Sequence, residues 1–439
     1  MFGLPTTATA PFCPAEVAGT VTVPQNAPLW KKIARFAGPG LLISVGYMDP
    51  GNWATSIQAG SQYGYQLLFV VILSSLAAIV LQCLSMRLGI ATGKDLAVHC
   101  REQYGPRVGK MQWFFAEVAI VACDFAEVLG SALAFKLLLG VSLPVGVLLT
   151  AFDTLIVLGL KGKGFRQIEA IILGLIVTIG VCLFAELLFI KPDWHGVLAG
   201  AVPSLQAISS QEPLYLAIGI LGATVMPHNL YLHSSVVQTR VVAKNDGARR
   251  EAISLARIDT IVSLLLALVI NAAILILAGT AFFNPGNPVA IGIDDAYHLL
   301  DPFAGAAAAI LFGLALLASG QSSTFTGTIA GQVIMDGFLK LRIPCWQRRL
   351  ITRLLALGPA LIGVLMLGEH SVGQLLVLSQ VVLSLQLPFA MYPLIRLTTR
   401  SDIMGSFANS RLTILLAWTL FSVISAANLW LVVQALGLV

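Results

Sequence analysis

Apolar runs long enough to cross a membrane recur along the whole chain of 439 residues. A helix needs about 20 such residues to cross the roughly 30 Å hydrocarbon core of a bilayer. Charged residues make up 11% of the sequence, against roughly 25% in soluble domains. The alternating pattern of a membrane β-barrel is absent. We therefore predict an all-α integral membrane protein with about eleven transmembrane helices, at residues 38–58, 65–90, 112–138, 142–160, 168–190, 213–238, 256–283, 303–333, 350–368, 373–396 and 411–436.

The basic residues predict the orientation of this bundle. If the N-terminus is cytoplasmic, 24 of the 26 Lys and Arg residues lie in or beside inner loops, and only Lys136 and Lys191 lie outside. Basic residues concentrate on the cytoplasmic side of membrane proteins. We therefore predict a multi-pass protein of the cell membrane, the inner membrane in a bacterium, with its N-terminus inside and its C-terminus outside. The net charge of +5 is then explained by topology and membrane lipids, without nucleic acid.

The rest of the domain organisation follows from composition. Residues 1–30 lack the basic start and apolar core of a signal peptide, and we interpret them as a flexible cytoplasmic tail. Residues 31–439 are predicted to form one transmembrane domain. None of the six cysteines belongs to a C-x-x-C pair, so the sequence predicts no disulfide framework and no zinc site.

Two of the predicted spans are interrupted by proline. The first contains "MDPGN" and the sixth contains "VMPHN". Five crossings separate them, so they run in opposite directions, as in the inverted repeats of secondary transporters. We predict two inverted five-helix repeats, at residues 31–195 and 205–400, in which helices 1 and 6 are broken, and one extra helix at 411–436.

The two interruptions are equivalent when Pro50 is superposed on Pro227. Asn52 then aligns with Asn229, and Asp49 aligns with Met226. Each proline removes a backbone donor and breaks the helix. Carbonyls near Gly46 and Ala223 thereby lose their partners, which is tolerable in a membrane only where the backbone faces a cavity or an ion.

Asp49 is the most costly residue at these breaks. A charge at the bilayer centre costs between about 3 and more than 10 kcal/mol, and no basic residue lies at matching depth in the predicted spans. We therefore predict a cation site at Asp49. Asn52 lies on the same helical face and offers an amide oxygen, although alone it would equally suit helix packing.

Met226 decides which cation the site would prefer. A single methionine in a membrane helix usually serves packing, but this one is the symmetry mate of Asp49. A thioether biases an oxygen site toward softer transition metals. The predicted ligands of a loosely held Mn²⁺ or Fe²⁺ are Asp49, Asn52, Met226 and backbone oxygens near Gly46 and Ala223.

The third span carries three acids on one narrow helical stripe, Glu117, Asp124 and Glu127. Chains of intramembrane acids and histidines indicate a proton relay. The alternative is a structural ladder of salt bridges with arginines such as Arg240. In the sixth span, His228 lies beside the break and is a candidate for proton handling, whereas His233 is more consistent with a packed, hydrogen-bonded residue.

Two further polar segments lie in later spans. Gln380 in the tenth span either lends a carbonyl oxygen to the ion or bridges helices. The segment "GQSSTFTGTIAGQ" at residues 320–332 is rich in small residues and predicts a close helix-packing surface with a polar lining on one side.

These motifs resemble the Nramp family of proton-coupled divalent metal transporters, whose bacterial members are manganese importers. The likeness rests on "DPGN" in the first span, "MPHNLYLHS" in the sixth and the small-residue segment of the eighth. It implies the inverted-repeat fold of sodium-coupled amino-acid transporters. It also implies metal coordination by Asp49, Asn52, Met226, Gln380 and the backbone oxygens of Gly46 and Ala223, and a proton pathway through His228, Asp124, Glu127 and Arg240.

The sequence therefore predicts a secondary transporter that imports Mn²⁺, and also Fe²⁺, together with protons. The alternative is an amino-acid or other cation symporter of the same fold, although Asp49 would repel a substrate carboxylate. An enzyme is not expected, since no nucleophile pair or His-rich ligand spacing is present. We expect no permanently bound cofactor, no nucleic acid and no obligatory protein partner.

Overall fold

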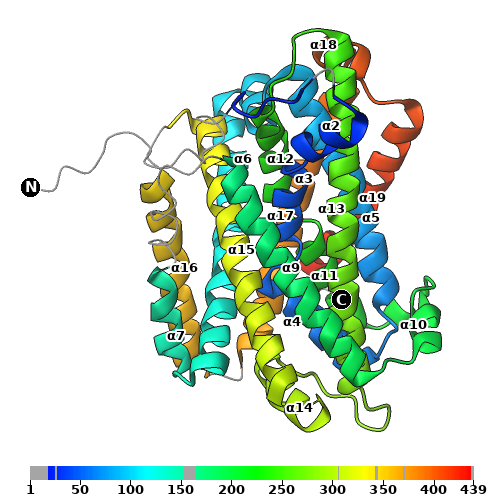
Figure 1. Ribbon diagram of the computed structural model, residues 1–439, viewed down its shortest axis with the longest axis vertical. Helices are drawn as coiled ribbons and strands as arrows, with labels where there is room; N and C mark the ends of the chain where they lie inside the picture. Colours follow the sequence, from blue (N-terminus) through cyan, green and yellow to red (C-terminus); the bar gives the residue numbers. More distant parts are fainter. Residues whose placement is uncertain are drawn as a thin grey trace, which may run out of the picture.

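The computed structural model describes residues 18–24, 27–152, 165–304, 306–341, 345–368 and 371–436. Within these residues the chain forms a bundle of α-helices (Figure 1). Its only β-type pairing there is an isolated bridge between Val21 and Arg240.

Eight of the eleven predicted spans correspond, among the described residues, to helices long and apolar enough to cross a membrane. They are α5 (Leu68–Thr92), α6 (Leu96–Leu139), α9 (Phe165–Ile190), α13 (Asp246–Ala281), α15 (Ala306–Leu339), α16 (Cys345–Leu367), α17 (Val372–Thr399) and α19 (Arg411–Ala435). Helices α6 and α13 begin well before the predicted spans. Helix α6 kinks at Gly105, which has a φ of 77° and is followed by Pro106. The kink forms because proline cannot continue the preceding helical turn.

The other three predicted spans are interrupted or short. The first consists of α3 (Pro39–Gly46) and α4 (Pro50–Tyr63), and the sixth of α11 (Gln211–Thr224) and α12 (Pro227–Val236). The fourth, predicted at 142–160, begins with α7 (Leu143–Leu149) and the 3₁₀ turn η1 (Thr150–Phe152). Its remaining residues lie outside the described part of the chain.

Short helices and 3₁₀ turns lie toward the two ends of the bundle. Helices α2 (Leu29–Phe36) and α18 (Ser401–Met404) lie at one end, and α10 (Trp194–Gly200) and α14 (Ile293–Ala304) lie toward the other (Figure 1). We call these the α2 end and the α14 end. The remaining 3₁₀ turns are η2 (Gln206–Ile208), η3 (Val237–Thr239) and η5 (Gly405–Phe407).

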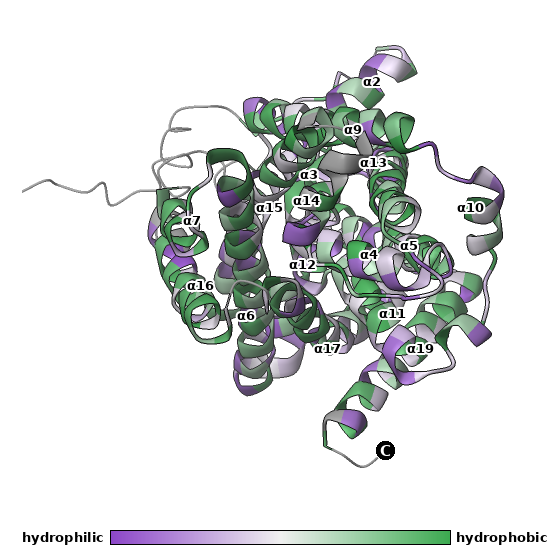
Figure 2. Ribbon diagram, turned by 90° about the horizontal axis from the view of Figure 1, so that it is seen from below, coloured by the Kyte–Doolittle hydropathy of each residue, from purple (hydrophilic) through white to green (hydrophobic). Residues whose placement is uncertain are grey.

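The broken helices occupy the centre of the bundle. Seen along the bundle, α3, α4 and α12 are surrounded by the other helices, while α7, α16 and α19 lie at the periphery (Figure 2). Nine of the ten residues of α12 are buried. Unpaired backbone N–H and C=O groups cannot face lipid. The central position of these helices therefore allows the chain to interrupt two spans.

Part of the predicted N-terminal tail contacts the bundle. Residues 1–17 lie outside the described residues, but Gly19 and Val21 donate backbone hydrogen bonds to Gln238 and Thr239, and Val241 donates to Val21. Helix α2 already begins at Leu29. Backbone hydrogen bonds and the start of α2 thus connect residues 19–24 and 27–30 to the bundle, and the flexibility predicted for residues 1–30 stays a prediction.

Candidate functional site

The two breaks form as the prolines predict. Helix α3 ends at Gly46 and α4 begins at Pro50, so no N–H is available for the Gly46 carbonyl, four residues earlier. Pro227 has the same effect on the carbonyl of Ala223. Both breaks lie in the buried centre of the protein, as the cation-site hypothesis requires.

Asp49 is fully buried, and its two carboxylate oxygens differ. Oδ1 accepts hydrogen bonds from the backbone N of Asn52 at 2.8 Å and from Asn52 Nδ2 at 2.7 Å. Oδ2 is buried and has no hydrogen-bond partner in the described part of the chain. A buried carboxylate oxygen without a donor is costly, and a bound cation would satisfy it.

Asn52 joins the two breaks. Besides contacting Asp49, its Nδ2 donates to the carbonyl of Ala223 at 3.0 Å. On its other side, Asn271 Nδ2 of α13 lies 3.4 Å from Asn52 Oδ1 and 2.7 Å from the carbonyl of Tyr47. The backbone oxygens of the breaks are thus partly satisfied by side chains from neighbouring helices.

Met226 lies beside the first break. It is fully buried, and a Cβ atom placed on Gly46 would lie 3.3 Å from its sulfur. Asn229 Nδ2 is 3.8 Å from the same sulfur, and Asn229 Oδ1 is a buried oxygen without a partner among the described residues. The structure therefore brings the thioether to Gly46, as the proposed symmetry requires.

Gln380 reaches the first break from α17. A Cβ atom on Gly51 would overlap its side-chain amide, so the amide lies directly against the first turn of α4. Its Nε2 donates to Ser379 Oγ at 3.0 Å, and its Oε1 is buried and unpartnered in the described chain. Gln380 thus lies against Gly51 with its Nε2 nearest to the break.

The resulting donor set is one carboxylate, several amide and backbone oxygens, and one thioether. No group of three or more His, Cys, Asp and Glu side chains among the described residues has the arrangement of a metal site. Tightly held structural metals commonly use such clusters. The groups at the two breaks are therefore of a different kind from such a cluster.

The acidic stripe lies between α6 and the small residues of α15. Glu127 Oε2 accepts a hydrogen bond from Thr324 at 3.0 Å. A Cβ atom on Gly327 would lie 3.2 Å from Glu127 Oε1 and 3.6 Å from Asp124 Oδ1. The segment at 320–332 thus provides both close packing and a polar lining, as predicted.

Glu117, at the far end of the stripe, has a different environment. Both of its carboxylate oxygens lie 2.5 Å from Arg348 Nη2 of α16. The structural salt bridge that was the alternative to a relay therefore exists at this acid, but its partner is Arg348 rather than Arg240.

His228 lies closer to the stripe than His233 does. Its Nε2 is 3.9 Å from Cys123 Sγ, which in turn lies 3.6 Å from Glu127 Oε1. His233 instead lies 2.9 Å from Gln82 Oε1, and Gln82 donates to Tyr47 Oη at 2.7 Å. His233 is therefore a packed, hydrogen-bonded residue, and Gln82 links it to Tyr47 at the first break.

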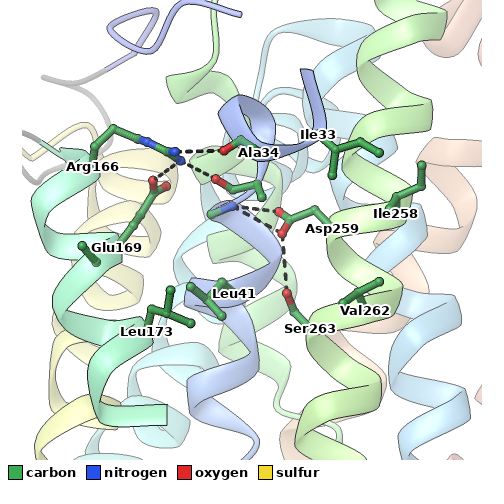
Figure 3. Close-up of a pocket in the computed structure, with 13 residues that line it drawn as sticks. Ile33, Ala34, Leu41, Arg166, Glu169, Leu173, Ile258, Asp259, Val262 and Ser263 are labelled. Atoms are coloured by element: carbon green, nitrogen blue, oxygen red, sulfur yellow. Dashed lines mark hydrogen bonds and ion pairs between the residues drawn. The ribbon is translucent and has the colours of Figure 1, made fainter. Parts of the chain in front are cut away.

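Arg240 is not near the acidic stripe. It forms a buried ion pair with Glu169 of α9 at 2.8 Å. It also donates to the carbonyls of Phe36 and Ala37, at the joint between α2 and α3. Asp259 of α13 accepts from the backbone N of Gly38, at 3.2 Å to Oδ2 (Figure 3). It also accepts from the backbone N of Gly40 at 2.7 Å, at the start of α3. These residues fasten α3 at the α2 end.

Sequence reasoning missed several of these groups. Asn271 and Ser319 donate to the carbonyls of Tyr47 and Met48 at the first break, and each stands alone in an apolar or small-residue run. Asn229 could have been identified from the sequence, because it aligns with Asn52 when Pro227 is superposed on Pro50. No local pattern indicates that Glu169 and Asp259 meet α3.

Two antiparallel broken helices around a buried carboxylate, in a bundle of apolar helices, define a membrane transporter of the inverted-repeat class. The fold is shared with the solved structure of Mhp1, a nucleobase-cation-symport-1 family transporter, with a TM-score of 0.59 over 90% of this chain and 91% of that chain. At 15% identity this likeness shows the fold alone. A family model described as natural resistance-associated macrophage protein-like matches residues 40–434. The chain belongs to this family, Nramp.

Closer relatives agree with this assignment. A Ralstonia nicotianae protein named divalent metal cation transporter MntH is 68% identical over 435 residues, which are 99% of this chain and 98% of the relative. The crystal structure of a mutant manganese transporter from Eremococcus coleocola is 38% identical, with a TM-score of 0.88 over 94% of this chain and 89% of that chain. The predicted family and fold class are confirmed.

Proposed function

We propose that this chain imports Mn²⁺, and also Fe²⁺, across the cell membrane by alternating access coupled to protons. The observation that carries the proposal is the unpartnered, fully buried Oδ2 of Asp49, at the same break whose Gly46 lies beside the thioether of Met226. A lone carboxylate with a soft neutral donor suits a divalent transition metal better than Mg²⁺ or Ca²⁺. The substrates in the names of the relatives support the same choice.

The proposed ligands are Asp49, Asn52, Met226 and Gln380, with the backbone oxygens of Gly46 and Ala223. In the structure, Asn52 Nδ2 donates to Asp49 Oδ1 and to the carbonyl of Ala223. A cation would repel this donor, so binding requires the amide to rotate and present Oδ1. Loss of the Asn52 bridge would also release α11 from α4, which would link metal binding to movement of the two breaks.

The proposed proton route begins at His228 and continues through Asp124 and Glu127. Proximity supports it, since Cys123 contacts both His228 and Glu127. Glu117, paired with Arg348, and His233, bonded to Gln82, would then be supporting residues. Arg240 would act through the α2–α3 joint rather than by contact with the acids. No covalent step is required, so the protein is proposed to be a transporter and not an enzyme.

The proposed orientation follows from the basic residues. The α2 end would face the cytoplasm, with the N-terminus inside and the C-terminus outside, in the inner membrane if the cell is bacterial. This agrees with the concentration of Lys and Arg in cytoplasmic loops. The Arg240–Glu169 pair would then close the cytoplasmic side.

Reconstitution into liposomes with an internal pH dye tests the function. Addition of external Mn²⁺ should cause metal uptake and internal acidification together, and Asp49→Ala should abolish both. Asp402→Ala, which removes a carboxylate that is 62% exposed on α18, is the matched control and should transport normally. Mn²⁺ uptake by Asp49→Ala at the unmodified rate would overturn the site, and uptake without acidification in the unmodified protein would overturn the coupling.

A further inference from the structure

Helix α17, which carries Gln380 to the first break, also contains a proline in its interior. Pro388 has no N–H, so the carbonyl of Ser384, four residues earlier, has no helical hydrogen-bond partner. Ser384 is fully buried, and a backbone carbonyl without a partner is costly inside a membrane. Helix α17 therefore has the same backbone problem as the two broken helices, although it continues from Val372 to Thr399.

The missing hydrogen bond is supplied by α19. Asn428 Nδ2 donates to the carbonyl of Ser384 at 2.7 Å, and Ser384 Oγ donates to Asn428 Oδ1 at 2.8 Å. One buried amide thus satisfies both polar groups of Ser384. The serine hydroxyl has an alternative acceptor in the carbonyl of Gln380, one turn earlier, whereas the freed carbonyl has no alternative donor in the ladder of its own helix.

The position of Asn428 is unusual for its helix. Helix α19 lies at the periphery beside α11 and α17 (Figure 2), and many of its side chains, such as Leu415 and Leu429, are exposed. Leu431 packs with Ile218 of α11 and Val381 of α17, so apolar contacts already hold the three helices together. An asparagine in a membrane helix can serve packing alone, but this one meets the carbonyl that Pro388 frees.

The turn of α17 that Asn428 contacts reaches both breaks. The Gln380 amide lies against Gly51 at the first break, and a Cβ atom on Gly222 would overlap the backbone oxygen of Gln380. Gly222 precedes Ala223, whose carbonyl is freed at the second break. Because Gln380 and Ser384 are one helical turn apart, a shift of α17 at Ser384 would move Gln380 with it.

We propose that Asn428 is a positioning residue for the metal site. It replaces the hydrogen bond that Pro388 cannot donate, and it thereby fixes the turn that presents Gln380 to the first break. Helix α19, which lies outside the two repeats, would then influence metal binding without contacting the ion. The proposal deepens the proposed function and rests on it, because it takes Gln380 as a metal ligand.

Removal of the Asn428 amide tests this. Asn428→Leu keeps a similar volume but loses both hydrogen bonds to Ser384. The dissociation constant for Mn²⁺, measured by isothermal titration calorimetry on the purified full-length chain, should rise about tenfold or more, as when other supporting partners of metal ligands are lost. An unchanged dissociation constant would overturn the proposal.

Two proline variants show whether Asn428 acts through the freed carbonyl. Pro388→Ala restores an N–H four residues after Ser384, so Asn428→Leu should change the Mn²⁺ affinity little in this background. Pro393→Ala is the matched control, since it restores the N–H for the carbonyl of Phe389 instead, and Asn428→Leu should still cost about tenfold there. An equal loss in both backgrounds would overturn the proposal, because Asn428 would then act by packing alone.

The same comparison covers a failure to fold. If Asn428→Leu alone does not fold, its combination with Pro388→Ala should fold, because the Ser384 carbonyl regains its helical partner. A combined variant that also fails to fold would contradict the proposal.

A third background separates positioning from stability. In Gln380→Ala the side chain that Asn428 is proposed to position is absent, so Asn428→Leu should lower the Mn²⁺ affinity no further. A second loss of about tenfold in that background would show that Asn428 does not act through Gln380. The proposed function has its own test at Asp49, which none of these variants alters, so the two proposals can fail independently.

Discussion

Asp49 and Met226 occupy the same position in the two broken helices. Each is the residue immediately before the proline that begins the second half-helix. Asp49 caps its half-helix by accepting from the N–H of Asn52, whereas Met226 forms no side-chain cap. The pseudo-symmetric pair thus places one hard, charged group and one soft, neutral group at equivalent positions of the two breaks.

The sulfur of Met226 should decide selectivity among divalent ions. Met226→Leu keeps a similar volume, so it should cost less than about 1.5 kcal/mol of stability. The affinity for Cd²⁺ should fall about tenfold or more, as for other changes to a metal site, while Ca²⁺ and Mg²⁺ compete better. Competition of each ion with Mn²⁺ uptake in proteoliposomes measures this.

Met391→Leu is the control for that substitution. Met391 is also fully buried, but it lies on α17 about 16 Å along the helix from Gln380. Its loss should leave the order of ion preference unchanged. An unaltered order in Met226→Leu as well would show that the sulfur is not a ligand.

The absence of a side chain at Gly51 should be essential for the site. Gly51→Ala would place a methyl group where the Gln380 amide lies, so Gln380 must move away from the break. We expect Mn²⁺ uptake to fall about tenfold while the protein still folds. Gly180→Ala on α9 is the control, because a Cβ atom there meets no atom within 4 Å. Equal uptake by the two variants would argue against Gln380 at the site.

Two acids of the stripe should respond differently to neutralisation. Glu127→Gln should leave Mn²⁺ uptake measurable but reduce the accompanying acidification to the level of protein-free liposomes, because the proposed proton carrier is lost. Glu117→Gln should instead leave Arg348 without its partner and lower stability by about 3 kcal/mol. Uptake with a pH dye and chemical unfolding measure the two effects. Normal acidification in Glu127→Gln would remove this acid from the proposed route.

The breaks could be predicted from the sequence because their cause is local. Proline removes a donor wherever it stands, so Pro50 and Pro227 identify the interrupted helices without knowledge of the fold. The pairing of Asp49 with Met226 then follows from the symmetry between the two motifs. The continuous spans are equally local, since length and hydropathy suffice.

The partners of buried polar groups could not be predicted in the same way. Asn271 reaches the carbonyl of Tyr47 across 224 residues, and which of several arginines meets which acid depends on helix packing. Arg240 was expected near the acidic stripe but pairs with Glu169, because the turn after α12 directs it to the α2–α3 joint. These pairings depend on how the helices pack together, and they leave no periodic pattern in the sequence.

The Arg240–Glu169 pair should behave as one buried unit. Both side chains are almost fully buried, at 0% and 4% exposure, and Glu169 also pairs with Arg166 at 3.0 Å. Glu169→Gln removes the carboxylate that pairs with the buried Arg240 and should lower the free energy of unfolding by about 3 to 5 kcal/mol, whereas Arg240→Gln should cost less, because Arg166 still pairs with Glu169. The double variant should cost less than the sum of the two, because the buried Arg240 charge is no longer present. Unfolding of the purified proteins by denaturant measures the four free energies of this double-mutant cycle. The control is the exposed pair Arg400–Asp402. The costs of Arg400→Gln and Asp402→Asn should simply add. If the Arg240 and Glu169 costs also add, the two residues do not stabilise α3 as a pair.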